Sequence, residues 1–142
     1  MFIKLTNGVP ENYTIGQLRK DNPNVSFPKD IPLETLSEYN VYPLTVEDRP
    51  SYNHLTEDAV LGTPTEVNGA WTQNYSVVQK PQEDVEINIR RHRNNLLSES
   101  DWTQIPDCTV DQTAWATYRQ ALRDIPSQEG FPFNVTWPTK PE

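Results

Sequence analysis

Cys108 and the two histidines are the residues of this chain that could support nucleophilic chemistry. A cysteine nucleophile needs a base close to it in space and surroundings that favour the thiolate. His54 and His92 are the available bases, but nothing in the sequence brings either of them to the single cysteine. We therefore expect no catalytic residue of this kind.

Paired carboxylates are a second candidate, because two of them can flank a glycosidic bond during hydrolysis. Glu34 and Glu38 would share one face of a helix, and Glu99 lies two positions before Asp101. Acidic chains contain such pairs often, and this one has 20 acidic residues against 12 basic ones. We interpret the pairs as solvated surface; a small hydrolase is a distant alternative.

Cofactor and metal sites are not expected either. One cysteine and two histidines are too few for a structural zinc site, and no carboxylate lies at metal-ligand spacing beside either histidine in a predicted helix. The five glycines form neither a dinucleotide fingerprint nor a phosphate-binding loop. No apolar run reaches the length of a membrane-spanning helix. The sequence predicts a protein without cofactor, metal or membrane segment.

The charge of the chain argues against nucleic acid as a partner. The net charge is −8, whereas proteins that bind DNA or RNA neutralise phosphates with lysine and arginine. The sharpest basic cluster consists of Arg90, Arg91 and Arg93. We interpret it as a solvated helix face with salt bridges. The alternative is a docking patch for an acidic partner, because arginine can bind a carboxylate with two parallel hydrogen bonds.

Aromatic and arginine side chains gather in the last third of the chain, a composition typical of protein-contact surfaces. The aromatic residues there exceed what two helices can hide, so we expect another chain to cover some of them. Each fully buried aromatic could contribute on the order of 1.5–3 kcal/mol. For the members at helical spacing, a place in the core is the alternative. The residues predicted to make the contact are Trp102, Trp115, Tyr118, Arg119, Leu122, Arg123, Phe131 and Trp137.

Two helices and an extended tail would position these residues. Apolar side chains recur at helical spacing over residues 85–96 and again over 115–125. Thr109 and Gln112 have the spacing of a capping box before the second helix, and Pro126 should end it. The short turn between the helices predicts an αα-hairpin. The tail that follows is apolar at alternate positions, which indicates an extended strip lying over the hairpin.

Before residue 80 the sequence predicts short strands and short helices. An alternating strand over residues 2–5 leads into Asn7-Gly8, a dipeptide typical of tight hairpin turns. Thr14 and Gln17 form a capping box that begins a short helix. A second short helix should begin at Pro32.

Further strands are expected after Asn40, a plausible left-handed stop for the second helix. Residues 41–44 are predicted to be an edge strand, since Pro43 cannot donate to a central ladder. Residues 45–59 should be loop, and residues 65–67 and 70–77 should form a hairpin around Asn68-Gly69.

These patterns together predict an α+β protein of two parts. Residues 1–80 form an N-terminal lobe of short strands and short helices. Residues 81–142 form a C-terminal αα-hairpin with an extended aromatic and proline-rich tail. The chain also has 13 prolines and only 35% hydrophobic residues. We therefore expect much irregular structure and a modest core.

The C-terminal motifs resemble the tail assembly chaperone family of tailed bacteriophages, over about residues 86–138. The N-terminal lobe is similar to amino-terminal segments of small phage proteins through the segments at residues 15–19, 21–24, 26–28 and 41–43. The C-terminal resemblance lies in the combined order of Arg93-Asn94-Asn95-Leu96-Leu97, Ser100-Asp101-Trp102-Thr103-Gln104, Pro106-Asp107, residues 115–125, Gly130-Phe131-Pro132 and Val135-Thr136-Trp137-Pro138.

The resemblance implies a non-enzymatic protein that binds phage tail or tail-fibre proteins and assists tail assembly in the host cytoplasm. The alternative is a resident structural component of the virion tail, such as a tail-tip, baseplate or fibre-attachment protein. Phage tails obey rotational symmetry, so a homo-oligomer or a symmetric ring would be natural in that case. Neither nucleic acid nor a membrane is expected as a partner.

Overall fold

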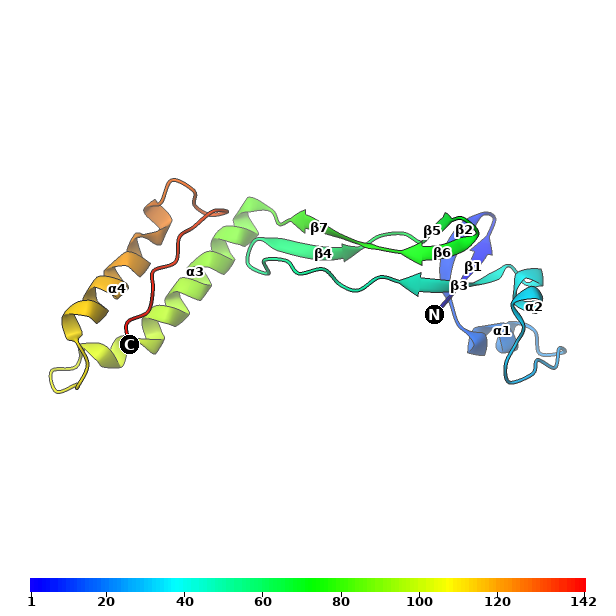
Figure 1. Cartoon of the computed structure of the whole chain (residues 1–142), viewed down its shortest axis with the longest axis horizontal. Helices are drawn as coiled ribbons and strands as arrows, with labels where there is room; N and C mark the ends of the chain where they lie inside the picture. The colour runs from blue at the N-terminus through cyan, green and yellow to red at the C-terminus, as the bar shows by residue number, and fades with distance from the viewer. The chain divides into compact units, whose positions relative to one another are not determined.

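The computed structural model describes all 142 residues, which divide into two compact units. Unit 1 comprises Met1–Ser51 and Ala59–Val77, and unit 2 comprises Tyr52–Asp58 and Val78–Glu142. Strands and short helices make up the N-terminal part, and two longer helices dominate the C-terminal part (Figure 1). The predicted α+β fold is confirmed. Unit 2 also includes the segment Tyr52–Asp58, which lies before the predicted boundary at residue 80.

Unit 1 begins with the predicted hairpin. Strand β1, Phe2–Thr6, pairs antiparallel with β2, Val9–Tyr13. Between them Asn7 and Gly8 have φ angles of 54° and 82°. These positive angles give the turn a twist that matches the two strands, and asparagine and glycine adopt them at little cost.

Two short helices, α1 and α2, follow this hairpin. The predicted capping box begins α1, Ile15–Asp21: the Gln17 backbone N–H donates to Thr14 Oγ1 at 3.1 Å. Helix α2, Leu33–Glu38, begins after Pro32, and Asn40 follows it with a φ of 57°. The core of the unit joins both helices to the strands through four buried residues, Tyr13, Leu18, Leu36 and Val41.

Strand β3, Val41–Val46, lies in the centre of a five-stranded sheet with the order β2-β1-β3-β6-β5, so the predicted edge position is wrong. Pro43 faces Phe2 of β1. The neighbouring hydrogen bonds run from Leu44 N–H to Met1 O and from Leu5 N–H to Asn40 O. The Pro43 nitrogen therefore points away from β1, and pairing with β6 begins one residue later. A central strand tolerates proline at this place because no ladder bond is lost.

The second predicted hairpin forms, but its second strand is interrupted. Strands β5, Thr65–Val67, and β6, Ala70–Gln73, pair around Asn68 and Gly69, which have positive φ angles. The strand is interrupted at Asn74, whose backbone carbonyl accepts a hydrogen bond from Gly62 N–H at 2.9 Å.

Beyond the break, β7, Tyr75–Gln79, pairs with β4, Glu57–Leu61, in a separate two-stranded sheet. The segment predicted as one strand over residues 70–77 is thus divided between two sheets. Strand β4 begins inside residues 45–59, which were predicted to be loop. Of that segment only the part between β3 and β4 lacks strands.

Unit 2 contains the predicted αα-hairpin. Helix α3, Gln82–Glu99, follows Pro81 and is connected to α4, Gln112–Asp124, through a 3-10 helix, η1, Asp101–Gln104. The predicted capping box of Thr109 and Gln112 is wrong. Asp111 caps α4 instead, and its Oδ1 accepts from Thr113 and Ala114 N–H, both at 3.0 Å. A carboxylate at this position satisfies the free amides and suits the positive helix end.

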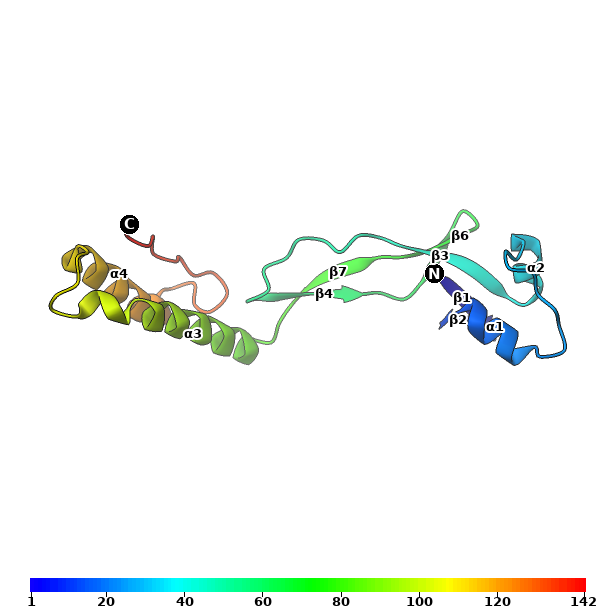
Figure 2. The ribbon, with the colours of Figure 1, turned by 90° about the horizontal axis from the view of Figure 1, so that it is seen from below.

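The tail covers the core of this hairpin. Six buried residues form the core: Val85, Ile89, Trp115, Tyr118, Leu122 and Ile125. The half-buried residues of the tail pack against them at alternate positions, as predicted: Phe131, Phe133, Val135 and Trp137. Figure 2 shows the tail, drawn in red, running back along one side of the helix pair. Before it, Pro126 lies in a second 3-10 helix, η2, Ile125–Ser127, directly after α4.

Candidate protein-contact surface

Arg119 is internal, which corrects its predicted place in a contact surface. The residue is 8% exposed. One guanidinium nitrogen, Nη1, donates to Leu97 O at 2.6 Å and to Ser100 Oγ at 2.8 Å, and Nη2 donates to Asp101 Oδ1 at 2.6 Å. A cation is favourable at the C-terminal end of a helix, where carbonyl groups lack partners. Arg119 therefore holds the end of α3.

Trp115, Tyr118 and Leu122 are also inside unit 2, with 4%, 6% and 0% exposure. They lie on the face of α4 that packs against α3, because their spacing brings them to one side of the helix. Burial raises the pKa of Tyr118, and the negative charge of Glu99 raises it further. These three residues occupy the core position that was the alternative to surface contact.

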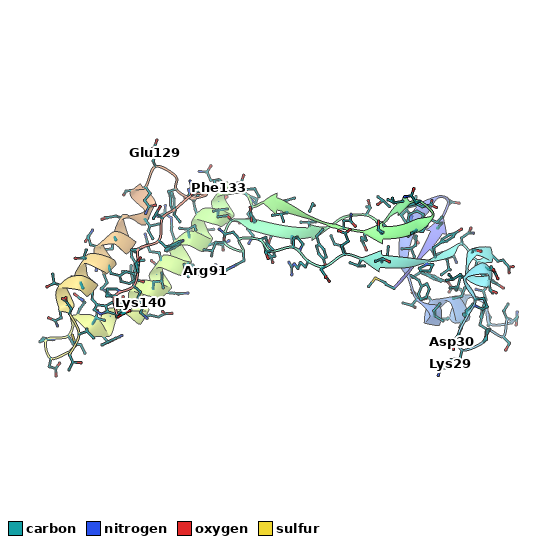
Figure 3. All side chains as sticks on the ribbon, in the orientation of Figure 1. Lys29, Asp30, Arg91, Glu129, Phe133 and Lys140 are labelled. Carbon is teal, nitrogen blue, oxygen red and sulfur yellow. The ribbon has the colours of Figure 1, made fainter.

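The indole N–H of Trp115 is buried and has no hydrogen-bond acceptor within the chain. The Lys140 ammonium lies 5.8 Å from the centre of the Trp115 ring. Figure 3 shows Lys140 toward the end of the tail and Phe133 nearer its start. The tail thus runs from the end of the hairpin where α4 ends back to the region of Trp115, near the beginning of α4.

Phe131 and Trp137 are half-buried, because each packs against a residue of α3. The Arg90 guanidinium lies 5.1 Å from the centre of the Phe131 ring. The rings of Trp137 and His92 meet edge to face at 4.7 Å. The tail thus shelters much of the aromatic surface that was expected to need another chain.

Trp102, Arg123 and Ile105 remain exposed. Trp102 is 51% exposed and rests against the Trp115 ring, with 6.1 Å between ring centres. Ile105 is 52% exposed and donates its N–H to Trp102 O at 3.4 Å. Sequence reasoning overlooked Ile105, although an isolated apolar residue beside Pro106 in a polar turn was a usable signal. We call Trp102 and Ile105 the apolar pair of the α3–α4 connection.

The side chain of Cys108, the candidate nucleophile, has two hydrogen-bond partners within unit 2. Cys108 Sγ donates to Thr103 O at 3.1 Å and accepts from Gln112 Nε2 at 3.2 Å. No group of three or more histidine, cysteine, aspartate or glutamate side chains is arranged to hold a metal ion. None of the helices has both the length and the apolar character needed to cross a membrane.

Comparison with protein families gives a match for the C-terminal part of the chain. Residues 86–142 match the family model described as phage tail assembly chaperone protein. The matched stretch contains most of α3, all of α4 and the tail. This supports the resemblance predicted for residues 86–138, whereas nothing supports the predicted similarity of the N-terminal lobe to small phage proteins. No curated protein and no solved structure matches the chain.

Proposed function

We propose that the chain is a non-enzymatic protein that assists bacteriophage tail assembly by binding a tail or tail-fibre protein through unit 2. The family match carries this proposal, because it covers the helical hairpin and its tail. Its work in assembling tails would place the chain in the host cytoplasm.

The apolar pair would make the central contact. Burying Trp102 and Ile105 against a partner would contribute on the order of 1.5–3 kcal/mol for each side chain. An exposed ion pair, such as one made by Arg123 at the rim, contributes about 1 kcal/mol or less. The apolar pair should therefore dominate the affinity. Its preorganisation supports this role, because Arg119 fixes Asp101, the neighbour of Trp102, and so reduces the entropy lost on binding.

Replacement of Trp102 tests this contact. We expect Trp102→Ser to lower the amount of tail protein that co-purifies with the chain from infected cells by about tenfold or more, and to lower the yield of complete tails. Ile87→Ser is the matched control, since Ile87 is 48% exposed on α3, away from the connection. Equal effects of the two substitutions would contradict a central contact at Trp102.

Mass spectrometry of purified phage particles separates a transient from a resident role. We propose a transient role, in which the chain leaves once the tail is assembled. A fixed copy number in mature particles would instead identify a structural component of the virion tail. Light scattering of the purified chain would then show whether a homo-oligomer or ring exists without other tail proteins.

A further inference from the structure

A depression of about 220 Å³ on unit 2 is lined almost entirely by side chains that carry N–H groups. No carboxylate lines it, although the chain has a net charge of −8. All of its lining residues belong to unit 2. We call it the donor pocket, and its residues are His54, Leu55, Lys80, Asn88, Arg91, His92 and Asn95.

Helix α3 supplies one wall of the donor pocket through a stripe of four polar residues. Asn88, Arg91, His92 and Asn95 follow one another at the spacing i, i+3, i+4 and i+7, which places them on one face of the helix. Figure 3 shows Arg91 on this helix. The sequence thus contains a second stripe beside the apolar one that forms the core.

The segment Tyr52–Asp58 supplies the opposite wall and is fastened by hydrogen bonds from Asn88 and Lys80. Asn88 Nδ2 donates to Leu55 O at 3.2 Å, and Lys80 Nζ donates to His54 O at 2.6 Å. Leu55 also packs against the core of the hairpin. The pocket therefore has two walls that are tied together, as a preorganised binding site requires.

Arg91 is the cation of the pocket that has no partner of its own. Nη2 of the neighbouring Arg90 lies 3.5 Å from Glu86 Oε2, and Arg93 Nη2 donates to Asn94 Oδ1 at 2.8 Å. Lys80 Nζ lies 3.4 Å from Asp58 Oδ1. The Arg91 guanidinium makes no hydrogen bond or ion pair within the chain, so all of its donors are available to a ligand.

We propose that the donor pocket binds a carboxylate side chain from an acidic segment of the protein that unit 2 contacts. This inference rests on the proposed function and adds the chemistry of the partner. A guanidinium offers two parallel N–H groups to a carboxylate, and Asn95 and Asn88 add neutral donors beside it. A nucleic acid fits less well, because its many phosphates would meet the negative charge of the whole chain.

A peptide titration of the purified full chain tests the proposal. The probe is a short synthetic peptide with two adjacent glutamates between glycine and serine residues. Its counterpart carries two glutamines, and inorganic phosphate and a short single-stranded DNA are tested in parallel. Amide chemical shifts in NMR spectra locate the binding site and yield the dissociation constant.

We expect the glutamate peptide to shift the amides of residues 54–55 and 88–95 and to bind at least about fivefold more tightly than the glutamine peptide. Arg91→Gln should weaken binding about tenfold. Arg93→Gln is the matched control: it removes the same charge from the same helix, outside the pocket, and should have little effect.

Three outcomes would overturn the proposal: equal binding of the two peptides, equal loss in the two arginine variants, or tighter binding of the DNA. The titration needs no phage. Its failure would therefore leave the proposed role in tail assembly standing, and a failure of that role in infected cells would leave the titration valid.

Discussion

Arg119 connects the end of α3 to Asp101, the first residue of η1. Its guanidinium bonds to Leu97 O, to the Ser100 hydroxyl and to the Asp101 carboxylate. The Ser100 hydroxyl in turn donates to Leu96 O at 2.8 Å. Buried charges are stable when such partners surround them. The bonds orient the segment that exposes Trp102, the residue that we propose makes the central contact.

In unit 1, the surroundings of Tyr13 make the stability of the folded chain depend on pH. Its hydroxyl donates to Asp21 Oδ2 at 2.5 Å. Burial, this hydrogen bond and the charge of Asp21 raise the pKa of Tyr13 from 10.0 to about 12. The folded chain therefore holds the phenol proton more tightly than the unfolded chain does. The resulting stability is fully present below pH 10 and is lost as the pH rises toward about 12.

Tyr13→Phe should expose this pH dependence. At neutral pH the variant should be less stable by about 1 kcal/mol, because the hydrogen bond is lost. The difference from the natural chain should shrink above pH 10, where the natural chain loses its advantage. Urea unfolding at a series of pH values measures this difference. Tyr39→Phe is the control, and a difference that stays constant for Tyr13→Phe would contradict the expectation.

At the scale of elements, the close approach of Gly130 and Asn134 fixes the course of the tail. Gly130 O accepts from Asn134 N–H at 2.7 Å, which closes a tight turn after η2. A Cβ atom added at Gly130 would lie 2.0 Å from Asn134 O. Gln128 strengthens the turn, since its amide pairs with the backbone N–H and O of Thr136 at 2.7 and 2.9 Å.

Gly130→Ala should therefore loosen the tail. The backbone of Asn134 would have to move, and such overpacking costs about 1–3 kcal/mol. Lower thermal stability and altered tryptophan fluorescence, from Trp137, would report the change. Gly16→Ala is the matched control, because its added atom would meet only Thr14 Oγ1 at 3.7 Å. The expectation fails if both substitutions leave the fluorescence unchanged.

The elements that could be predicted from sequence are those set by neighbouring residues. The Asn-Gly turns, the capping box at Thr14 and the two helical stripes depend only on local spacing, and the structure contains all of them. The central place of β3 and the break at Asn74 depend on distant strands. For the candidate surface, spacing located the α4 stripe but could not tell whether α3 or another chain covers it.

At the scale of the whole molecule, neither unit is one continuous stretch of chain. The segment Tyr52–Asp58 belongs to unit 2, where Leu55 packs against the core and its carbonyl accepts a hydrogen bond from Asn88. The division also passes through β4 and β7, the two strands of the small sheet. A boundary near residue 80 therefore separates helix α3 from part of its own packing.

A fragment of residues 81–142 should be less stable than one of residues 52–142. The shorter fragment lacks Leu55, and loss of a buried leucine contact costs about 1.5–3 kcal/mol when burial is complete. Thermal unfolding followed by circular dichroism measures the difference, which should amount to several degrees. Identical unfolding midpoints of the two fragments would contradict a role for residues 52–58 in unit 2.

The interleaving of the two units also bears on how the hairpin could pass between genes. The stretch that matches the family begins at residue 86, whereas one of its packing partners is encoded well upstream. A recombination event that transplanted only the matched stretch would leave Leu55 behind, and the recipient gene would have to supply another residue to cover the core of the hairpin.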